Sequence, residues 1–153
     1  MYPRLTEFIR ARFPEAVAIY LFGSSAGLFG SSAGLFGSLA GLFGSLARPA
    51  DEQRADSDID LAVLLPSRIP ELERWALQEQ LAVIAGRNVD LIDLRAASAV
   101  MKVQVLDGGV LLYEGVRAER EAFEALALSD YARLNEERRG ILDDVRRLGS
   151  IHG

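Results

Sequence analysis

The sequence predicts a mixed α/β fold of the α+β kind, in which helices pack on a small mixed sheet and a further helix ends the chain. Two observations predict this class. Short apolar runs of strand length alternate with longer segments whose apolar residues recur at helical spacing. The 153 residues are half hydrophobic and a quarter charged, a composition that suits an ordinary globular domain with a single sizeable core.

The chain opens with a predicted helix and a predicted strand. Residues 2–13 carry Leu5, Phe8 and Ile9 at helical spacing, and the proline that follows ends the pattern. Residues 16–22 (AVAIYLF) form a short apolar run that suits a buried strand.

A second strand and a second helix follow after a long uncharged stretch. Residues 58–65 (DIDLAVLL) begin polar and end apolar, and a proline closes the run. Residues 70–85 predict a helix that stops at Gly86. We expect its apolar side chains to face the core: Leu72, Trp75, Leu81 and Ile84.

The remaining elements predict the rest of the sheet and its cover. Residues 89–94 (VDLIDL) are a third strand, 96–106 a helix, 107–109 (DGG) a turn and 110–113 a short last strand.

The C-terminal residues predict a long charged helical stretch over 117–148, with a break near Ser129 or Gly140 left open. We therefore divide the chain into a main domain, residues 1–116, with a repeat insertion at residues 21–48, and a C-terminal helical extension, residues 117–153.

A seven-residue unit occurs four times in succession over residues 21–48, reading LFGSSAG, LFGSSAG, LFGSLAG and LFGSLAR. Seven residues nearly close two helical turns, whereas an odd period in a strand would reverse the face of every side chain. The repeat therefore predicts a marginal helix, with a loop as the alternative, because each interior glycine costs about 1 kcal/mol relative to alanine. Residues 16–47 carry no charge, but nearly half of 21–47 are Gly or Ser, so we expect no membrane span.

Charge and composition exclude several classes of chemistry. Seventeen Lys and Arg against 22 Asp and Glu give a net charge of −5, which argues against direct binding of nucleic acid. The absence of cysteine excludes thiol catalysis and disulfides, and the single histidine lies one residue from the C-terminus. The chain also starts without the basic region of a signal peptide, so we expect it to be cytoplasmic. Carboxylates must carry the chemistry.

Three aspartates predict a metal site. Asp58 and Asp60 are two apart on a strand, so both carboxylates project from one face, and a divalent cation would relieve their repulsion. Asp90 joins them if the strand over 89–94 is the neighbour in register. Asp93 lies on the opposite face of that strand, so we expect it to be structural. Three such carboxylates frame Mg²⁺-dependent phosphoryl or nucleotidyl transfer.

A Gly-Ser pair directly after a buried strand predicts a phosphate-holding turn, because glycine lets the backbone approach a ligand and the amides that follow can bind an anion. The pattern LFGS…SDIDLAVLL…VDLIDL as a whole resembles the minimal nucleotidyltransferases of the polymerase-β-like superfamily. The stretches RWALQEQLA and LNEERRGILDDV are similar to the MntA-type antitoxins of HEPN/MNT toxin–antitoxin systems. The resemblance covers nearly the whole chain apart from the extra repeats.

The resemblance implies an activity and a role for each motif. Asp58 and Asp60 would bind Mg²⁺, Asp90 would help to activate the attacking hydroxyl and complete the metal site, and the Gly-Ser turn would hold ATP. The enzyme would move AMP from ATP onto a tyrosine of a partner HEPN-family RNase toxin and so silence it. Two alternatives remain: a catalytically impaired module that neutralises the toxin by direct contact, and a nucleotidyltransferase for a small hydroxylated molecule.

The chain departs from the family in having four Gly-Ser turns where the family has one. Gly44-Ser45 lies 14 residues before Asp58, close to the family spacing. Gly23-Ser24 instead follows the only convincing strand directly. The sequence leaves open which of these two copies holds the nucleotide, and whether the expansion abolishes activity.

Overall fold

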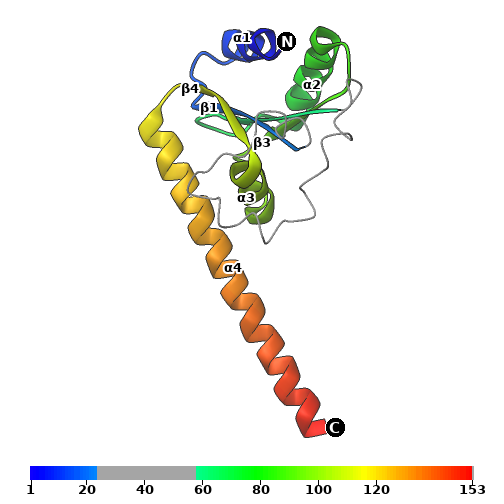
Figure 1. The fold of residues 1–153 in the computed structure, drawn as a ribbon, viewed down its shortest axis with the longest axis vertical. Coiled ribbons are helices and arrows are strands. Elements are labelled where there is room, and N and C mark those ends of the chain that lie inside the picture. Colours follow the sequence, from blue (N-terminus) through cyan, green and yellow to red (C-terminus); the bar gives the residue numbers. More distant parts are fainter. Residues whose placement is uncertain (24–57, 153) are drawn as a thin grey trace.

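The computed structural model describes residues 1–23 and 58–152, with side chains up to residue 148 (Figure 1). The elements follow in the order predicted from the sequence. They are α1 (Tyr2–Arg12), β1 (Ala18–Phe22), β2 (Ile59–Leu64), α2 (Glu71–Ala85), β3 (Val89–Asp93), α3 (Ala99–Gly108), β4 (Val110–Glu114) and α4 (Arg117–His152).

The four strands form one mixed sheet in the order β3-β2-β1-β4. Strand β1 is central and pairs antiparallel with β2 on one side and with β4 on the other. Strand β3 pairs parallel with β2 and forms an edge of the sheet. The predicted small mixed sheet is thus confirmed, and β1 ends where β2 and β3 begin.

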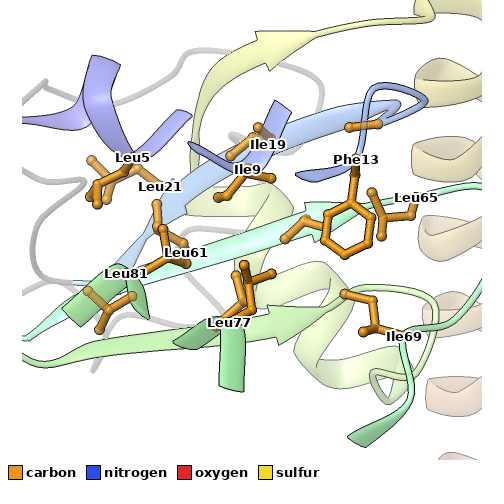
Figure 2. Close-up of a cluster of buried hydrophobic side chains, with 14 of the residues drawn as sticks. Leu5, Ile9, Phe13, Ile19, Leu21, Leu61, Leu65, Ile69, Leu77 and Leu81 are labelled. Carbon is orange, nitrogen blue, oxygen red and sulfur yellow. The ribbon is translucent and has the colours of Figure 1, made fainter. Parts of the chain in front are cut away.

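Alternating side chains of the strands build two cores. On one face, α1 and α2 cover the sheet, with Leu5 and Leu81 packed near Leu21 and Leu61 (Figure 2). On the other face, α3 and the first part of α4 do so, and Phe123 of α4 belongs to this second core. This division follows from the period of two along a strand, which sends neighbouring residues to opposite faces.

The helix ends follow local sequence signals. Helix α2 stops at Gly86, whose φ of 71° lies in the left-handed region that favours glycine, as predicted. Helix α3 starts later than predicted because the Ser98 hydroxyl accepts a hydrogen bond from the Met101 amide (3.1 Å) and caps it. Helix α3 also runs through Gly108, so the predicted turn is shorter.

One prediction about the helices is wrong, and one alternative that the sequence left open is decided. Leu72 and Trp75 were expected to face the core, but they are 85% and 56% exposed, whereas Leu77 and Leu81 are buried. Helix α4 continues without a break at Ser129 or Gly140. The proposed boundary after residue 116 stays a prediction.

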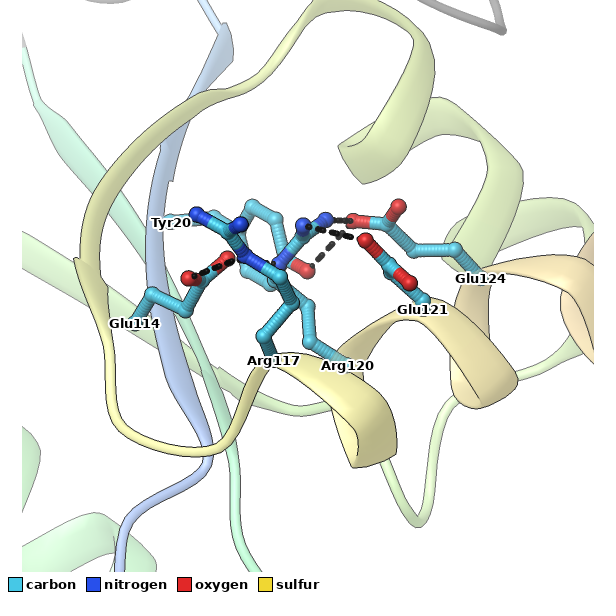
Figure 3. Close-up of polar contacts among 6 residues, drawn as sticks. All are labelled: Tyr20, Glu114, Arg117, Arg120, Glu121 and Glu124. Carbon is cyan, nitrogen blue, oxygen red and sulfur yellow. Dashed lines mark hydrogen bonds and ion pairs between the residues drawn. The ribbon is translucent and has the colours of Figure 1, made fainter.

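A polar network fixes the start of α4 on the sheet (Figure 3). The buried Tyr20 hydroxyl of β1 donates to Glu124 Oε1 (2.8 Å), and Arg120 donates to Glu124 (2.9 Å) and to Glu114 of β4 (2.6 Å). Burial and the Glu124 carboxylate raise the pKa of Tyr20 above its usual range. From this anchor α4 extends far beyond the sheet (Figure 1).

None of the helices in the described part of the chain is long and apolar enough to cross a membrane. The predictions for the repeat, a marginal helix or a loop, fall outside the described residues from position 24 onwards.

Candidate active site

Two of the three predicted carboxylates occupy neighbouring positions on the sheet. Asp60 of β2 and Asp90 of β3 are register partners in the parallel pair, so their side chains leave the sheet on the same face. Asp58 is exposed and comes just before β2, two residues from Asp60. The register that the sequence analysis required for Asp90 is therefore present, whereas the roles of the three residues stay predictions.

The adjacency follows from the residues around each aspartate. Ile59 and Leu61 are buried in the core beneath α1 and α2, which turns Asp60 to the opposite face. Val89 and Leu91 do the same for Asp90. Each aspartate thus lies between two apolar residues that fix its direction.

Gly23 lies against this carboxylate pair. It directly follows β1, whose last residue, Phe22, is the register partner of Asp60. Its φ is 71°, in the left-handed region. A methyl group placed on Gly23 would lie 3.1 Å from Asp60 Cγ and closer still to Asp60 Oδ2, so an alanine here would displace the Asp60 carboxylate as well as strain the backbone.

The other predicted nucleotide-binding residues, Ser24, Gly44 and Ser45, lie outside the described residues. Of the two copies under consideration, the structure thus describes only the glycine of the first.

Asp93 has the structural role predicted for it. It is 4% exposed, and its carboxylate accepts hydrogen bonds from the backbone amides of Ile69 (2.8 Å) and Arg95 (3.0 Å). The first bond fixes the connection between β2 and α2 to the end of β3, and the second fixes the chain that follows β3. Asp93 faces the side of the sheet opposite to Asp90.

Sequence reasoning missed Arg74 and Gln78 of α2, which both contact the backbone of β3 at Leu91, the residue after Asp90. Hydrogen bonding with Glu71 raises the pKa of Arg74, burial opposes this effect, and the charges of Asp90 and Asp93 add to the increase. The available signal was the spacing of four residues, which places Arg74 and Gln78 on one face of a helix.

The donor set fits Mg²⁺ that arrives with phosphates. Within residues 1–23 and 58–152, no three carboxylate or imidazole side chains gather closely enough to make a metal site by themselves. Mg²⁺ is usually held by one or two carboxylates, substrate phosphates and water rather than by a cage of protein ligands. Asp60, with Asp90 beside it and the close backbone of Gly23, matches such a partial site.

A shallow hollow of about 370 Å³ lies elsewhere, at the opposite end of β2. Phe13, Leu65 and Ile69 line it, and none of the predicted site residues does. We therefore do not connect it with the carboxylates.

The mixed sheet and the adjacent aspartates are compatible with the predicted nucleotidyltransferase site, and a comparison with protein families shows the family. Residues 38–117 match the family described as "Polymerase beta, Nucleotidyltransferase", and the chain belongs to that family. The match begins within the third copy of the repeat, so it includes Gly44-Ser45 and leaves β1 and Gly23 outside.

Within this family, the chain is similar to Protein adenylyltransferase MntA of Shewanella oneidensis. The two are 40% identical over 142 residues, which cover 93% of this chain and 85% of that protein.

Solved structures of toxin–antitoxin complexes are similar as well. One is a complex with AMP-PNP (33% identity, TM-score 0.68, covering 94% of this chain and 96% of that one). Another contains a tri-AMPylated Shewanella oneidensis HEPN toxin with its MNT antitoxin (31% identity, TM-score 0.66, covering 94% and 93%).

Proposed function

We propose that this chain is a protein adenylyltransferase that moves AMP from ATP onto a tyrosine hydroxyl of a partner HEPN-family RNase in the cytoplasm, and so acts as its antitoxin. The similarity to MntA over 93% of the chain carries the proposal. The relatives solved with AMP-PNP and with an AMPylated HEPN toxin support ATP as the donor and that toxin as the acceptor.

The carboxylates would divide the work. Asp58 and Asp60 would hold Mg²⁺ with the triphosphate of ATP, and Asp90, beside Asp60, would complete the metal site and accept the proton of the tyrosine hydroxyl. The hydroxyl oxygen then bonds to the α-phosphorus, the bond from this phosphorus to the bridging oxygen breaks, and pyrophosphate leaves. Mg²⁺ held there would neutralise part of the charge that develops on the phosphates.

We assign the nucleotide-holding turn to Gly23-Ser24 rather than to Gly44-Ser45. Gly23 directly follows the central strand β1 and lies against Asp60, a position that suits a phosphate-holding turn. The spacing argument for Gly44 is weaker, because a connection between two strands can lengthen without moving either strand.

The experiment is intact-mass spectrometry of the partner toxin after incubation with this protein, ATP and Mg²⁺. We expect the toxin to gain one or more AMP units with the wild-type protein and none with Asp60→Asn. Asp143→Asn is the matched control, because Asp143 is exposed on α4 and belongs to no predicted site.

Two outcomes would contradict the proposal. Full transfer by Asp60→Asn would remove the assignment of the site. No transfer by the wild-type protein, in a sample where the toxin is bound and inhibited, would favour the contact-only antitoxin instead.

A further inference from the structure

Strand β3, which carries Asp90, has an open edge. In its parallel pairing with β2, the Asn88 carbonyl accepts from the Ile59 amide (2.9 Å) and the Leu94 amide donates to the Val63 carbonyl (3.0 Å). Because alternate residues of a parallel strand bond to the neighbour, the backbone groups of Asp90 point inward and those of Leu91 point outward. Among the described strands, none lies beside Leu91 to pair with its amide and carbonyl.

Two side chains of α2 form the hydrogen bonds to Leu91 that a neighbouring strand would otherwise form. Gln78 Oε1 accepts a hydrogen bond from the Leu91 amide (2.9 Å), and Arg74 Nη1 donates to the Leu91 carbonyl (2.8 Å). Arg74 Nη1 also donates to Gln78 Oε1 (3.2 Å), which closes a ring of contacts. The two residues are four apart on the helix and so lie on the same face.

Arg74 is itself held in place. Its Nε donates to Glu71 Oε2 (3.0 Å), and its Nη2 forms an ion pair with the other oxygen of the same carboxylate. The Arg74 side chain is mostly buried, which limits the conformations open to it. A planar guanidinium fixed on one side presents its remaining donor in a defined direction.

The contacts of Leu91 with α2 also restrain the neighbouring residue, Asp90. Its own backbone is bound to β2, and the next residue is bound to α2, so the strand is held from both sides where the carboxylate leaves it. An open edge would instead exchange its bonds with water and fray. A shift of about 1 Å in a catalytic group can cost on the order of a hundredfold in rate.

We propose that Arg74 and Gln78 are positioning residues for the adenylyl transfer, because they clamp the edge strand so that the Asp90 carboxylate stays beside Asp60. This inference rests on the proposed function. Neither residue touches the reacting face, since Leu77 and Leu81 place that side of α2 on the core opposite to Asp60 and Asp90.

The test compares Gln78→Met, which removes the acceptor at similar volume, with Gln78→Glu, which keeps an acceptor oxygen. Gln80→Met is the matched control, because Gln80 is exposed on the same helix. With the partner toxin as acceptor, we expect Gln78→Met to lower kcat between about tenfold and a hundredfold with little change in the KM for ATP. Gln78→Glu should restore most of the kcat.

Amide hydrogen exchange gives a readout that does not depend on activity. The Leu91 amide should exchange about tenfold faster or more in Gln78→Met than in the wild-type protein, and at the wild-type rate in Gln80→Met. Unchanged exchange at Leu91 would overturn the clamp even if the wild-type protein transferred no AMP, a result that would count separately against the proposed function. Faster exchange with an unchanged kcat would leave a structural clamp and overturn its role in catalysis.

Discussion

Replacing Gly23 by alanine tests which Gly-Ser copy serves the site. A methyl group at position 23 would lie 3.1 Å from Asp60 Cγ, whereas carbon atoms normally approach no closer than about 3.5–4.0 Å. The contact with Cγ alone therefore requires the carboxylate to move roughly 0.4–0.9 Å away from the new methyl group, and the contact with Oδ2 requires a larger movement. Displacements of this size at a catalytic group can cost on the order of a hundredfold in rate.

The same change also affects stability, but less. A residue other than glycine at a φ of 71° costs roughly 1–2 kcal/mol. Native domains have about 5–15 kcal/mol to lose, so Gly23→Ala should remain folded at assay temperature. The expected result is thus a loss of activity of about two orders of magnitude, or about 2.7 kcal/mol in transition-state free energy, in a folded protein.

The assay is the initial rate of AMP transfer to the partner toxin, followed by intact mass, with folding checked by circular dichroism. Gly44→Ala is the matched control, because it makes the same change in the copy with family-like spacing, and it should retain the wild-type rate. If Gly23→Ala keeps the wild-type transfer rate while Gly44→Ala loses activity, the assignment to Gly23 is refuted and the turn belongs to the fourth copy.

Two further predictions concern stability. Asp93→Ala leaves the amides of Ile69 and Arg95 without their acceptor and should lower the free energy of unfolding by about 2–3 kcal/mol in urea titrations, with the transfer rate of the folded protein unchanged; an unchanged urea midpoint would contradict the structural role. Hydrogen bonds from Arg120, and secondarily from Arg117, lower the pKa of Glu114 below 4.5, so this carboxylate adds stability above that pH and loses it as the pH falls further. Arg120→Met should therefore show a shallower loss of stability below pH 4.5 than the wild-type protein, and parallel curves for the two proteins would contradict this assignment.

Much of the fold could be predicted because its strands are short apolar runs with clear ends. The shared face of the candidate carboxylates could be predicted for the same reason: Asp60 and Asp90 each stand between two apolar residues that enter the core. The register between β2 and β3 was only a condition in the sequence analysis, because no local signal specifies which strands pair.

The errors on α2 have a physical cause. Its inward face combines apolar Leu77 and Leu81 with polar Arg74 and Gln78, which bind the edge of β3. A search for apolar residues at helical spacing therefore selected Leu72 and Trp75, which lie on another face and are exposed. Residues on the inward face of a helix are usually apolar, but here two polar residues face inward because they bond to the edge strand. A single sequence does not reveal which strand lies at the edge of the sheet.

The sequence alone also does not decide between Gly23 and Gly44. Spacing to Asp58 favours Gly44, whereas continuity with the strand before the repeat favours Gly23. Every copy of the repeat begins Leu-Phe-Gly-Ser, so any copy placed after residues 16–20 completes the same strand and the same turn. Matching by spacing selects the copy nearest Asp58, and matching by strand continuity selects the first. Removing three consecutive copies leaves a chain in which both criteria select the same glycine. The two possible chains differ only in the first and third residues after Gly-Ser, which read Ser-Ala-Gly if the first copy stays and Leu-Ala-Arg if the fourth stays.

Under the proposed assignment of the turn to Gly23-Ser24, the extra copies add length between the turn and Asp58. The distance along the chain from the glycine to Asp58 is 35 residues from Gly23 and 14 from Gly44. For any flexible connection, this increase raises the entropic cost of closure by about 0.8 kcal/mol, since that cost grows only with the logarithm of length. A domain with about 5–15 kcal/mol of stability tolerates such a cost, so whole added units can preserve the pairing of β1 with β2 and the contact between Gly23 and Asp60.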